Sequence, residues 1–362
     1  MTIKCELLCP SSKYKLTQLF TGFGLLEKAG MIQLQLEKDK DYLIGYHSKE
    51  SMKVVLNDEI KIIYDIYDGD TIYPDELAWC DLYFKKSYNP EKVNSLNLTK
   101  KVLPLGFYYT LYGPNDHLAL RNYWALTNLI KQMSFNETAF QILRYDAFFS
   151  RLFKINSGRY LNDYKNYEHL PRFDLEPKII FFTKLWDPAR AHSDEIKIDR
   201  MQINEMRAEC IRLLKNNFPG SFLGGLEIND YTKKTYPGLV VAHSWMTKKE
   251  EYLRQLNKAT ICIATSGLHG AHGRKLGEYI AGSKAIVSEM IRYLVPGDFD
   301  KDKNYLEFST PEQCLENVAL LLENKEKRNA MMMNNFIYYN NYLRPDMLVW
   351  NSVMAALGIY FP

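Results

Sequence analysis

Residues 260–289 read TICIATSGLHGAHGRKLGEYIAGSKAIVSE, and the prediction of the fold begins from their pattern. The apolar runs at 260–264 and 284–288 predict two buried strands, and 274–281 predicts a helix between them. The loop at 266–273 joins the first strand to the helix and holds three glycines and two histidines. This order is typical of a parallel α/β sheet, which binds ligands where its strands end.

The loop and the start of the helix carry residue types that suit phosphate. Gly270 and Gly273 let the backbone approach a ligand closely, and a helix start presents unpaired N–H groups with partial positive charge. Arg274 and Lys275 stand in the first turn, where they oppose the helix dipole unless an anion binds. Glu278, one turn later, is placed to accept hydrogen bonds from vicinal ribose hydroxyls. The alternative is a structural loop in which Arg274 and Glu278 form an exposed ion pair.

The alternation of strands and helices extends to both sides of this stretch. Predicted strands lie at 3–9, 31–36, 52–56, 60–66, 82–84, 102–105, 178–182 and 239–242. Predicted helices lie at 14–29, 119–152, 198–217, 247–256, 311–323 and, with an interruption at Arg344-Pro345, 325–356. Repetition of strand, helix and strand favours parallel pairing and sheets covered on both faces. The polar, proline-closed stretch at 156–177 is the best candidate for a linker between two α/β halves.

Composition excludes several classes of protein. The chain has 362 residues, which predicts two domains, and its 46% hydrophobic and 25% charged residues exclude a disordered chain. The net charge of +3 gives no reason to expect nucleic-acid binding. Because no apolar run reaches about 18 residues and no signal peptide is visible, we expect a cytoplasmic protein. The six cysteines form no CxxC pair, so we expect reduced thiols and no metal cluster.

The run KLGEYIAGSKAIVSE resembles the end of the nucleotide-sugar site in GT-B glycosyltransferases, where a glutamate heads a helix of the form E-A-M-A-x-G-x-P-V-V. Glu278 and Gly282 match that pattern. Upstream, IIFFTKLWDPAR resembles the family's opening strand and basic loop, with Lys184 at the position of the family's arginine and Arg190 as a second cation. Residues 239–266 are similar to a stretch of the same family that ends in the dipeptide P-S, and Ser266 matches the serine of that dipeptide.

This resemblance implies two Rossmann-like domains with parallel sheets facing a central cleft. Residues 1–172 would bind the acceptor, 173–340 would bind the nucleotide-sugar donor, and 341–362 would form a helix that packs back on the N-terminal domain. The implied reaction transfers a sugar from a UDP- or GDP-linked donor to a hydroxyl of a polysaccharide, lipopolysaccharide or glycolipid, without metal or cofactor. The implied donor-binding residues are Lys184, Arg190, Ser266, Gly270, Gly273, Arg274, Lys275 and Glu278.

An inverting transferase also needs a base for the acceptor hydroxyl. Asp65, which ends the strand IKIIYD, is the candidate by its place at a strand end, although an aspartate there can simply form a turn. His269 and His272 are the other candidate catalytic residues. The D-x-D at 68–70 binds a divalent cation in the other large glycosyltransferase fold, but a turn is its commoner use, and we expect no metal.

Two other functions stay open on the sequence. One is a nucleotide-sugar epimerase of the same fold, and the other is a catalytically inactive nucleotide-sugar-binding protein. The loop around Ala271 lacks the second glutamate that many retaining members carry before the matched one. The expected partners are the donor and a glycan or lipid-linked acceptor, with peripheral association to the inner face of an anionic membrane permitted by the positive charge. Donor base, sugar, stereochemistry and oligomeric state do not follow from the sequence.

Overall fold

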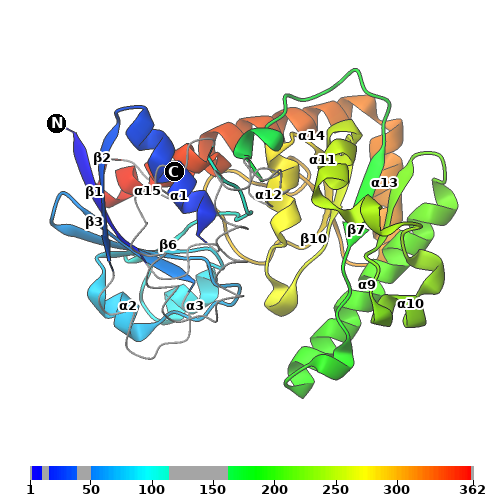
Figure 1. Ribbon diagram of the computed structural model, residues 1–362, viewed down its shortest axis with the longest axis horizontal. Coiled ribbons are helices and arrows are strands. Elements are labelled where there is room, and N and C mark those ends of the chain that lie inside the picture. Colours follow the sequence, from blue (N-terminus) through cyan, green and yellow to red (C-terminus); the bar gives the residue numbers. More distant parts are fainter. Residues whose placement is uncertain (1, 10–15, 39–49, 114–161, 360–362) are drawn as a thin grey trace, which may run out of the picture. The chain divides into compact units, whose positions relative to one another are not determined.

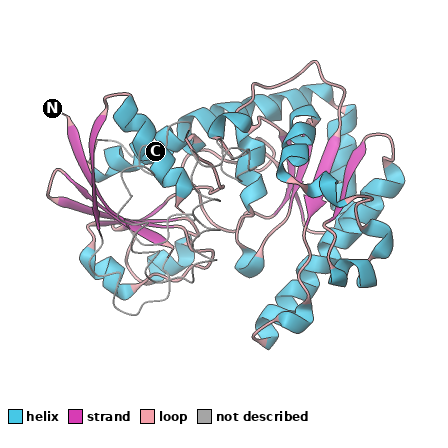
Figure 2. Ribbon diagram, viewed as in Figure 1, coloured by secondary structure: helices cyan, strands magenta, loops and turns pink. Residues whose placement is uncertain are grey.

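The computed structural model describes residues 2–9, 16–38, 50–113 and 162–359, so the helix expected at 119–152 lies outside the described residues. The chain forms two compact units, and each contains one β-sheet flanked by helices (Figures 1 and 2). Unit 1 comprises Met1–Asn166, Leu294–Gly297 and Asn340–Pro362, and unit 2 comprises Tyr167–Tyr293 and Asp298–Tyr339. The α/β class expected from the sequence is confirmed. The cleft expected between the sheets stays a prediction.

Unit 1 is built on a six-stranded sheet in the order β2-β1-β3-β4-β5-β6. Its strands are β1 (Ile3–Cys9), β2 (Ile32–Lys38), β3 (Ser51–Leu56), β4 (Ile60–Asp65), β5 (Leu82–Lys85) and β6 (Val102–Pro104). The α-helices among its described residues are α1 (Thr17–Lys28), α2 (Pro74–Trp79), α3 (Pro90–Ser95) and α15 (Pro345–Ala356).

The expectation of purely parallel pairing is wrong at β3, which runs antiparallel to both β1 and β4. The cause is the turn between β3 and β4. Asn57 and Asp58 both adopt positive φ angles, 51° and 62°, and only three residues separate the two strands. A connection this short forms a hairpin, whereas parallel strands need a crossover of a dozen or more residues.

The C-terminal helix returns to the N-terminal part of the chain, as expected. Helix α15 packs on α1 at Gly22, where an added Cβ would lie 2.1 Å from the carbonyl oxygen of Pro345. On the sheet side, the hydroxyls of Tyr64 in β4 and Ser352 in α15 are hydrogen-bonded at 2.6 Å. Only glycine allows two helices to approach this closely at that point.

Unit 2 is built on a five-stranded, fully parallel sheet in the order β11-β10-β9-β7-β8. Its strands are β7 (Ile179–Thr183), β8 (Phe222–Leu226), β9 (Ile261–Ala264), β10 (Ala285–Glu289) and β11 (Leu306–Phe308). Its α-helices are α9 (Asp194–Asn217), α10 (Asp230–Thr235), α11 (Lys249–Lys258), α12 (Arg274–Ala281), α13 (Pro311–Glu323) and α14 (Lys325–Tyr338). Short 3-10 turns are η3 (Pro188–Arg190), η4 (Pro237–Leu239), η5 (Ser244–Thr247) and η6 (Leu268–Gly270).

The strand expected at 239–242 is wrong. The segment begins in the 3-10 turn η4, and Val240 makes only an isolated parallel bridge to Leu226. The N–H of Leu239 donates inside this turn, to the carbonyl of Tyr236 at 3.0 Å, and the N–H of Val241 donates to the carbonyl of Leu226 at 3.1 Å, so the pairing with β8 is limited to one bridge.

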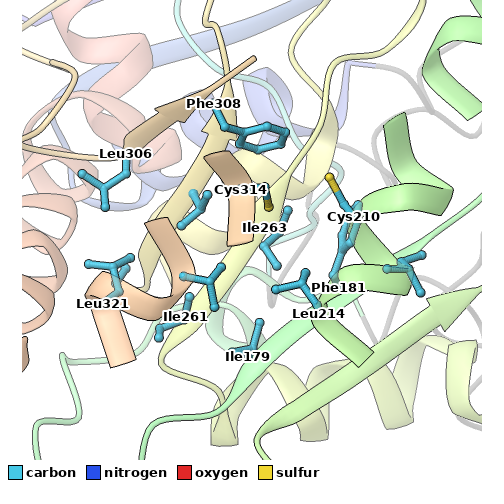
Figure 3. Packing of buried hydrophobic residues seen from close by; sticks show 14 of the residues in the cluster. Ile179, Phe181, Cys210, Leu214, Ile261, Ile263, Leu306, Phe308, Cys314 and Leu321 are labelled. Atoms are coloured by element: carbon cyan, nitrogen blue, oxygen red, sulfur yellow. The ribbon is translucent and has the colours of Figure 1, made fainter. Parts of the chain in front are cut away.

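Side chains of the unit 2 strands alternate between two buried faces. On one face, Ile179 and Phe181 of β7 pack with Leu214 of α9 and Cys314 of α13 (Figure 3). The intervening residues of β7, such as Ile180, are buried on the opposite face. Each apolar side chain buried this way contributes about 1.5–3 kcal/mol. The packing on both faces of the sheet fixes where the loops at the strand ends begin.

Candidate functional site

The strand order of unit 2 has one topological switch point, between β7 and β9. From β7 the chain crosses to β8 on one side, and from β9 it crosses to β10 on the other. Sheets of this kind bind ligands outside the carboxyl ends of the strands at the switch point. The loop at 184–187 follows β7 and the loop at 265–273 follows β9, so the predicted residues Lys184 and Ser266 meet at one edge of the sheet.

The loop after β9 makes a tight turn just before α12. His269 and Gly270 both have left-handed φ angles, 60° and 68°, and the N–H of Gly267 donates to the carbonyl of Ala271 at 2.9 Å. The N–H of Ser266 donates to Oε2 of Glu289 at 2.7 Å. Burial raises the pKa of Glu289, and its contact with the Ser266 N–H opposes that shift. The loop is thus held by its own backbone and by the end of β10.

The start of α12 is positively charged and lacks a side-chain cap. Its N-cap residue is Gly273, and the exposed Arg274 and half-buried Lys275 occupy the first turn without any acidic residue. Nζ of Lys275 donates to the carbonyl of Phe182 and lies 5.1 Å from the ring centre of Tyr252. Burial lowers the pKa of Lys275 to about 8. A cation held in so little water gains from a bound anion.

Glu278 is engaged by two residues of α11. Its Oε1 accepts from Nζ of Lys249 at 2.8 Å, and its Oε2 accepts from the hydroxyl of Tyr252 at 2.7 Å. The ion pair of Glu278 is therefore with Lys249, and not the pair with Arg274 that the sequence offered as an alternative. Burial, with Glu278 adding to it, raises the pKa of Tyr252. Each carboxylate oxygen keeps a second lone pair and can accept a further hydrogen bond. The expected contact with ribose hydroxyls is therefore compatible with this geometry and stays a prediction.

The residue after α12 that needs a left-handed backbone is Ser283, with φ of 53°, whereas Gly282 has φ of −81°. The family pattern places its glycine five residues after the glutamate, which is position 283 and not 282. The match to Gly282 is therefore wrong by one residue. Ser283 uses its side chain to donate a 2.6 Å hydrogen bond to the carbonyl of His169.

Arg207 of α9 is a site residue that the sequence reasoning missed. It is only 7% exposed and donates from Nη1 to the carbonyl of Lys184 (2.7 Å), from Nε to Oγ1 of Thr265 (3.0 Å) and from Nη2 to the carbonyl of Ser266 (2.9 Å). Burial lowers the pKa of Arg207 to about 10. A signal was present, because Arg207 lies four residues after Ile203, on the apolar face of the predicted helix.

The other predicted cations point to water. Lys184 is exposed, and it is its backbone carbonyl that contacts Arg207. The side chain of Arg190 is 81% exposed and lies 3.7 Å from Asp187 in the same 3-10 turn. Their contact with a ligand stays a prediction.

The two histidines join the loop after β9 to the segment after β10. Nε2 of His272 lies 3.1 Å from the carbonyl oxygen of Tyr293, and the hydroxyl of Tyr293 donates to the carbonyl of His269 at 3.0 Å. The N–H of His269 donates to Asp199 of α9 at 3.0 Å. These contacts hold the loop in place, and a catalytic role for either histidine stays a prediction.

Asp65 belongs to unit 1 and forms a buried ion pair there. Its Oδ2 accepts from Nζ of Lys85 at 2.8 Å and from the hydroxyl of Tyr83 at 2.6 Å, and its Oδ1 accepts from the N–H of Tyr67 at 2.8 Å. The side chains of Asp65 and Lys85 are each 1% exposed. Burial lowers the pKa of Lys85, and Asp65 opposes that shift. A base must reach the acceptor hydroxyl, so this role of Asp65 stays a prediction.

The two aspartates of the D-x-D each face a lysine. Asp68 pairs with Lys86, and Asp70 pairs with Lys92 at 2.9 Å and accepts from Asn89 at 3.0 Å. Among the described residues, no three His, Cys, Asp or Glu side chains gather as a metal site requires. No described helix has the length and apolar character needed to cross a bilayer.

Neither a protein-family model nor a curated protein matches the chain. Solved structures do match, at low similarity. HepE from Anabaena, in complex with UDP and glucose, is 12% identical with a TM-score of 0.36, covering 93% of this chain and 89% of HepE. The C-terminal domain of the glycosyl transferase group 1 family protein LpcC from Francisella tularensis is 11% identical with a TM-score of 0.35, covering 50% of this chain and 98% of that domain.

A putative UDP-N-acetylglucosamine 2-epimerase from Listeria monocytogenes is 13% identical with a TM-score of 0.34, covering 78% of this chain and 60% of that one. These likenesses concern the fold alone.

Proposed function

We propose that the protein is a glycosyltransferase that moves a sugar from a nucleotide-diphosphate donor to a hydroxyl of a glycan or lipid-linked acceptor. The observation that carries the proposal is the convergence at the switch point of unit 2. There Arg207 joins the loop after β7 to the loop after β9, and the second loop leads directly into the uncapped, cationic start of α12. We assign this anion site to a nucleotide sugar because the motifs at 178–289 resemble those of GT-B glycosyltransferases.

The arrangement suits a diphosphate leaving group. As the glycosidic bond breaks, negative charge builds on the diphosphate, and preorganised donors in a site with little water stabilise that charge. Lys275, Arg274 and the first N–H groups of α12 are the groups we assign to this task, with the exposed Lys184 of the loop after β7 as a further cation. This set requires no metal ion for charge neutralisation.

Glu278 is assigned to the ribose through its remaining lone pairs. It lies one helical turn beyond Lys275, and its contacts with Lys249 and Tyr252 fix the carboxylate in one orientation. A fixed carboxylate can accept from two vicinal hydroxyls without first losing rotamer freedom.

Calorimetric titration with UDP and with GDP tests the binding half of the proposal. We expect Arg274→Ala and Lys184→Ala each to weaken binding about three- to tenfold, in line with the loss of one charge-assisted contact. Lys258→Ala is the matched control, because Lys258 is also exposed but precedes β9 at the opposite end of the sheet. Equal losses in all three variants would show a nonspecific charge effect and would contradict the proposed site.

Turnover distinguishes the reaction. We expect slow donor hydrolysis when the chain is incubated with UDP- or GDP-sugars alone, and faster donor consumption with an acceptor glycan. An epimerised sugar formed without any acceptor would assign the protein to the isomerases. Tight nucleotide binding without turnover of any donor would make it a binding protein instead.

A further inference from the structure

Helix α9 buries polar side chains on the face that its sequence pattern assigns to the core. Asn204 is fully buried and Arg207 nearly so, next to the core residues Ile203 and Ile211. Burying an amide and a guanidinium is unfavourable unless both are hydrogen-bonded. The hydrogen-bond partners of these two side chains therefore indicate the role of this face of α9.

The first set of partners is the backbone after β7. Oδ1 of Asn204 accepts from the N–H of Trp186 at 3.2 Å, and its Nδ2 donates to the carbonyl of the same residue at 2.7 Å. Nη1 of Arg200 donates to the carbonyl of Asp187 at 2.9 Å. With the contact from Arg207 to Lys184, successive turns of α9 bind backbone groups of Lys184, Trp186 and Asp187.

The second set of partners lies in the loop after β9 and consists of the side-chain hydroxyl of Thr265 and two backbone groups. Arg207 binds Thr265 and the carbonyl of Ser266, and Oδ2 of Asp199 accepts from the N–H of His269. Since Glu289 takes the N–H of Ser266, that residue is held from both sides. The guanidinium of Arg207 also lies 4.7 Å from the ring centre of Trp186, which fixes its plane.

We infer that this polar face of α9, made of Asp199, Arg200, Asn204 and Arg207, is a positioning device that sets both donor loops before a nucleotide arrives. Arg207 is the central positioning residue, because its contacts span both loops while its N–H groups are directed at protein acceptors. A loop already ordered in the free protein does not have to be ordered on binding, so more of the contact energy appears as affinity. The assignment of nucleotide binding to these loops rests on the proposed function, whereas their positioning by α9 rests on the hydrogen bonds described above.

Hydrogen exchange of the nucleotide-free protein tests the positioning directly. Asp199→Ala should speed exchange in 265–271 only, and Arg200→Met in 184–188 only, because each residue holds one loop. Arg207→Ala should speed exchange in both segments. Arg212→Ala is the control on the same helix: Arg212 is exposed, pairs with Glu209, and should change neither segment.

Should Arg207→Ala fold poorly, Arg207→Lys serves in its place, since lysine keeps the charge but cannot span three acceptors. Unchanged exchange in both loops of the Arg207 variant, or equal acceleration throughout unit 2, would overturn the inference. Added guanidinium ion should restore slow exchange in Arg207→Ala, which a merely destabilised core would not show.

UDP and GDP titration then connects the positioning to binding. We expect Arg207→Ala to weaken nucleotide binding roughly tenfold, the size of one charged hydrogen bond. If the wild-type protein bound neither nucleotide while the exchange pattern held, the proposed function would fail and the positioning would stand. If binding were normal and the exchange pattern absent, the positioning would fail and the proposed function would stand.

Discussion

The ion pair between Glu278 and Lys249 gives the sharpest quantitative prediction. Nζ of Lys249 lies 2.8 Å from Oε1 of Glu278, and the side chains are 26% and 8% exposed. Lys249 also lies 4.7 Å from the ring centre of Tyr167. A double-mutant cycle with Glu278→Gln, Lys249→Met and the combined variant isolates the energy of the pair.

The expected magnitude follows from the burial of the two partners. Glu278→Gln keeps a hydrogen-bonding oxygen and removes the charge, which should lower the free energy of unfolding by about 2 kcal/mol. Lys249→Met leaves a nearly buried carboxylate without its cation and should lower it by about 3 kcal/mol, at the lower end for buried pairs because Lys249 reaches water. Both single variants break the same ion pair. The free energy of unfolding of the double variant should therefore fall by about 1–2 kcal/mol less than the sum of the two single losses.

Urea unfolding followed by circular dichroism measures these energies, and unchanged m-values confirm that the compared states are the same. Additivity within about 0.5 kcal/mol would refute the coupling. The same variants separate a structural role of Glu278 from a ribose contact. If Glu278 binds ribose, Glu278→Gln should weaken UDP binding while leaving binding of inorganic pyrophosphate unchanged. Equal weakening of both probes would remove the ribose contact from the account.

Three further predictions follow from the geometry. UDP affinity should fall as the pH rises through about 8, because Lys275 loses its proton there, and the fall should vanish in Lys275→Met when calorimetric titrations at successive pH values are compared. Lys85→Met should destabilise unit 1 by about 3–5 kcal/mol by leaving Asp65 buried and unpaired, and a change below about 1 kcal/mol in urea unfolding would contradict the buried pair. Gly22→Ala should lower the melting temperature by several degrees, about 1–3 kcal/mol, because the new Cβ meets the backbone of Pro345; an unchanged melting curve would show that α1 and α15 do not touch there.

Local patterns predicted most of the elements of unit 2. The helix at 274–281 and the helix at 311–323 have the bounds predicted for them, since glycine flanks the first and proline opens the second. Strand β8 was missed because Gly224 and Gly225 interrupt its apolar run. Glycine is needed at position 224 because of a residue distant in sequence: a Cβ there would lie 2.4 Å from the carbonyl oxygen of Phe181.

The candidate site was predictable only in part, for a similar reason. The glycine loop and the cations at 274–275 are local and can be found from the sequence. The contacts of Arg207 and Lys249 depend on which helix packs against which loop, and no spacing along the chain encodes that. The antiparallel β3 was missed because the left-handed angles at Asn57 and Asp58 were not anticipated from the turn chemistry.

Crystals of the protein soaked with saturating UDP or GDP show whether unit 2 binds a diphosphate at the carboxyl ends of its strands. We expect density for a diphosphate within hydrogen-bonding distance of the 265–273 loop and the first turn of α12. Density for the nucleotide at any other part of the chain, with that loop unliganded, would contradict it.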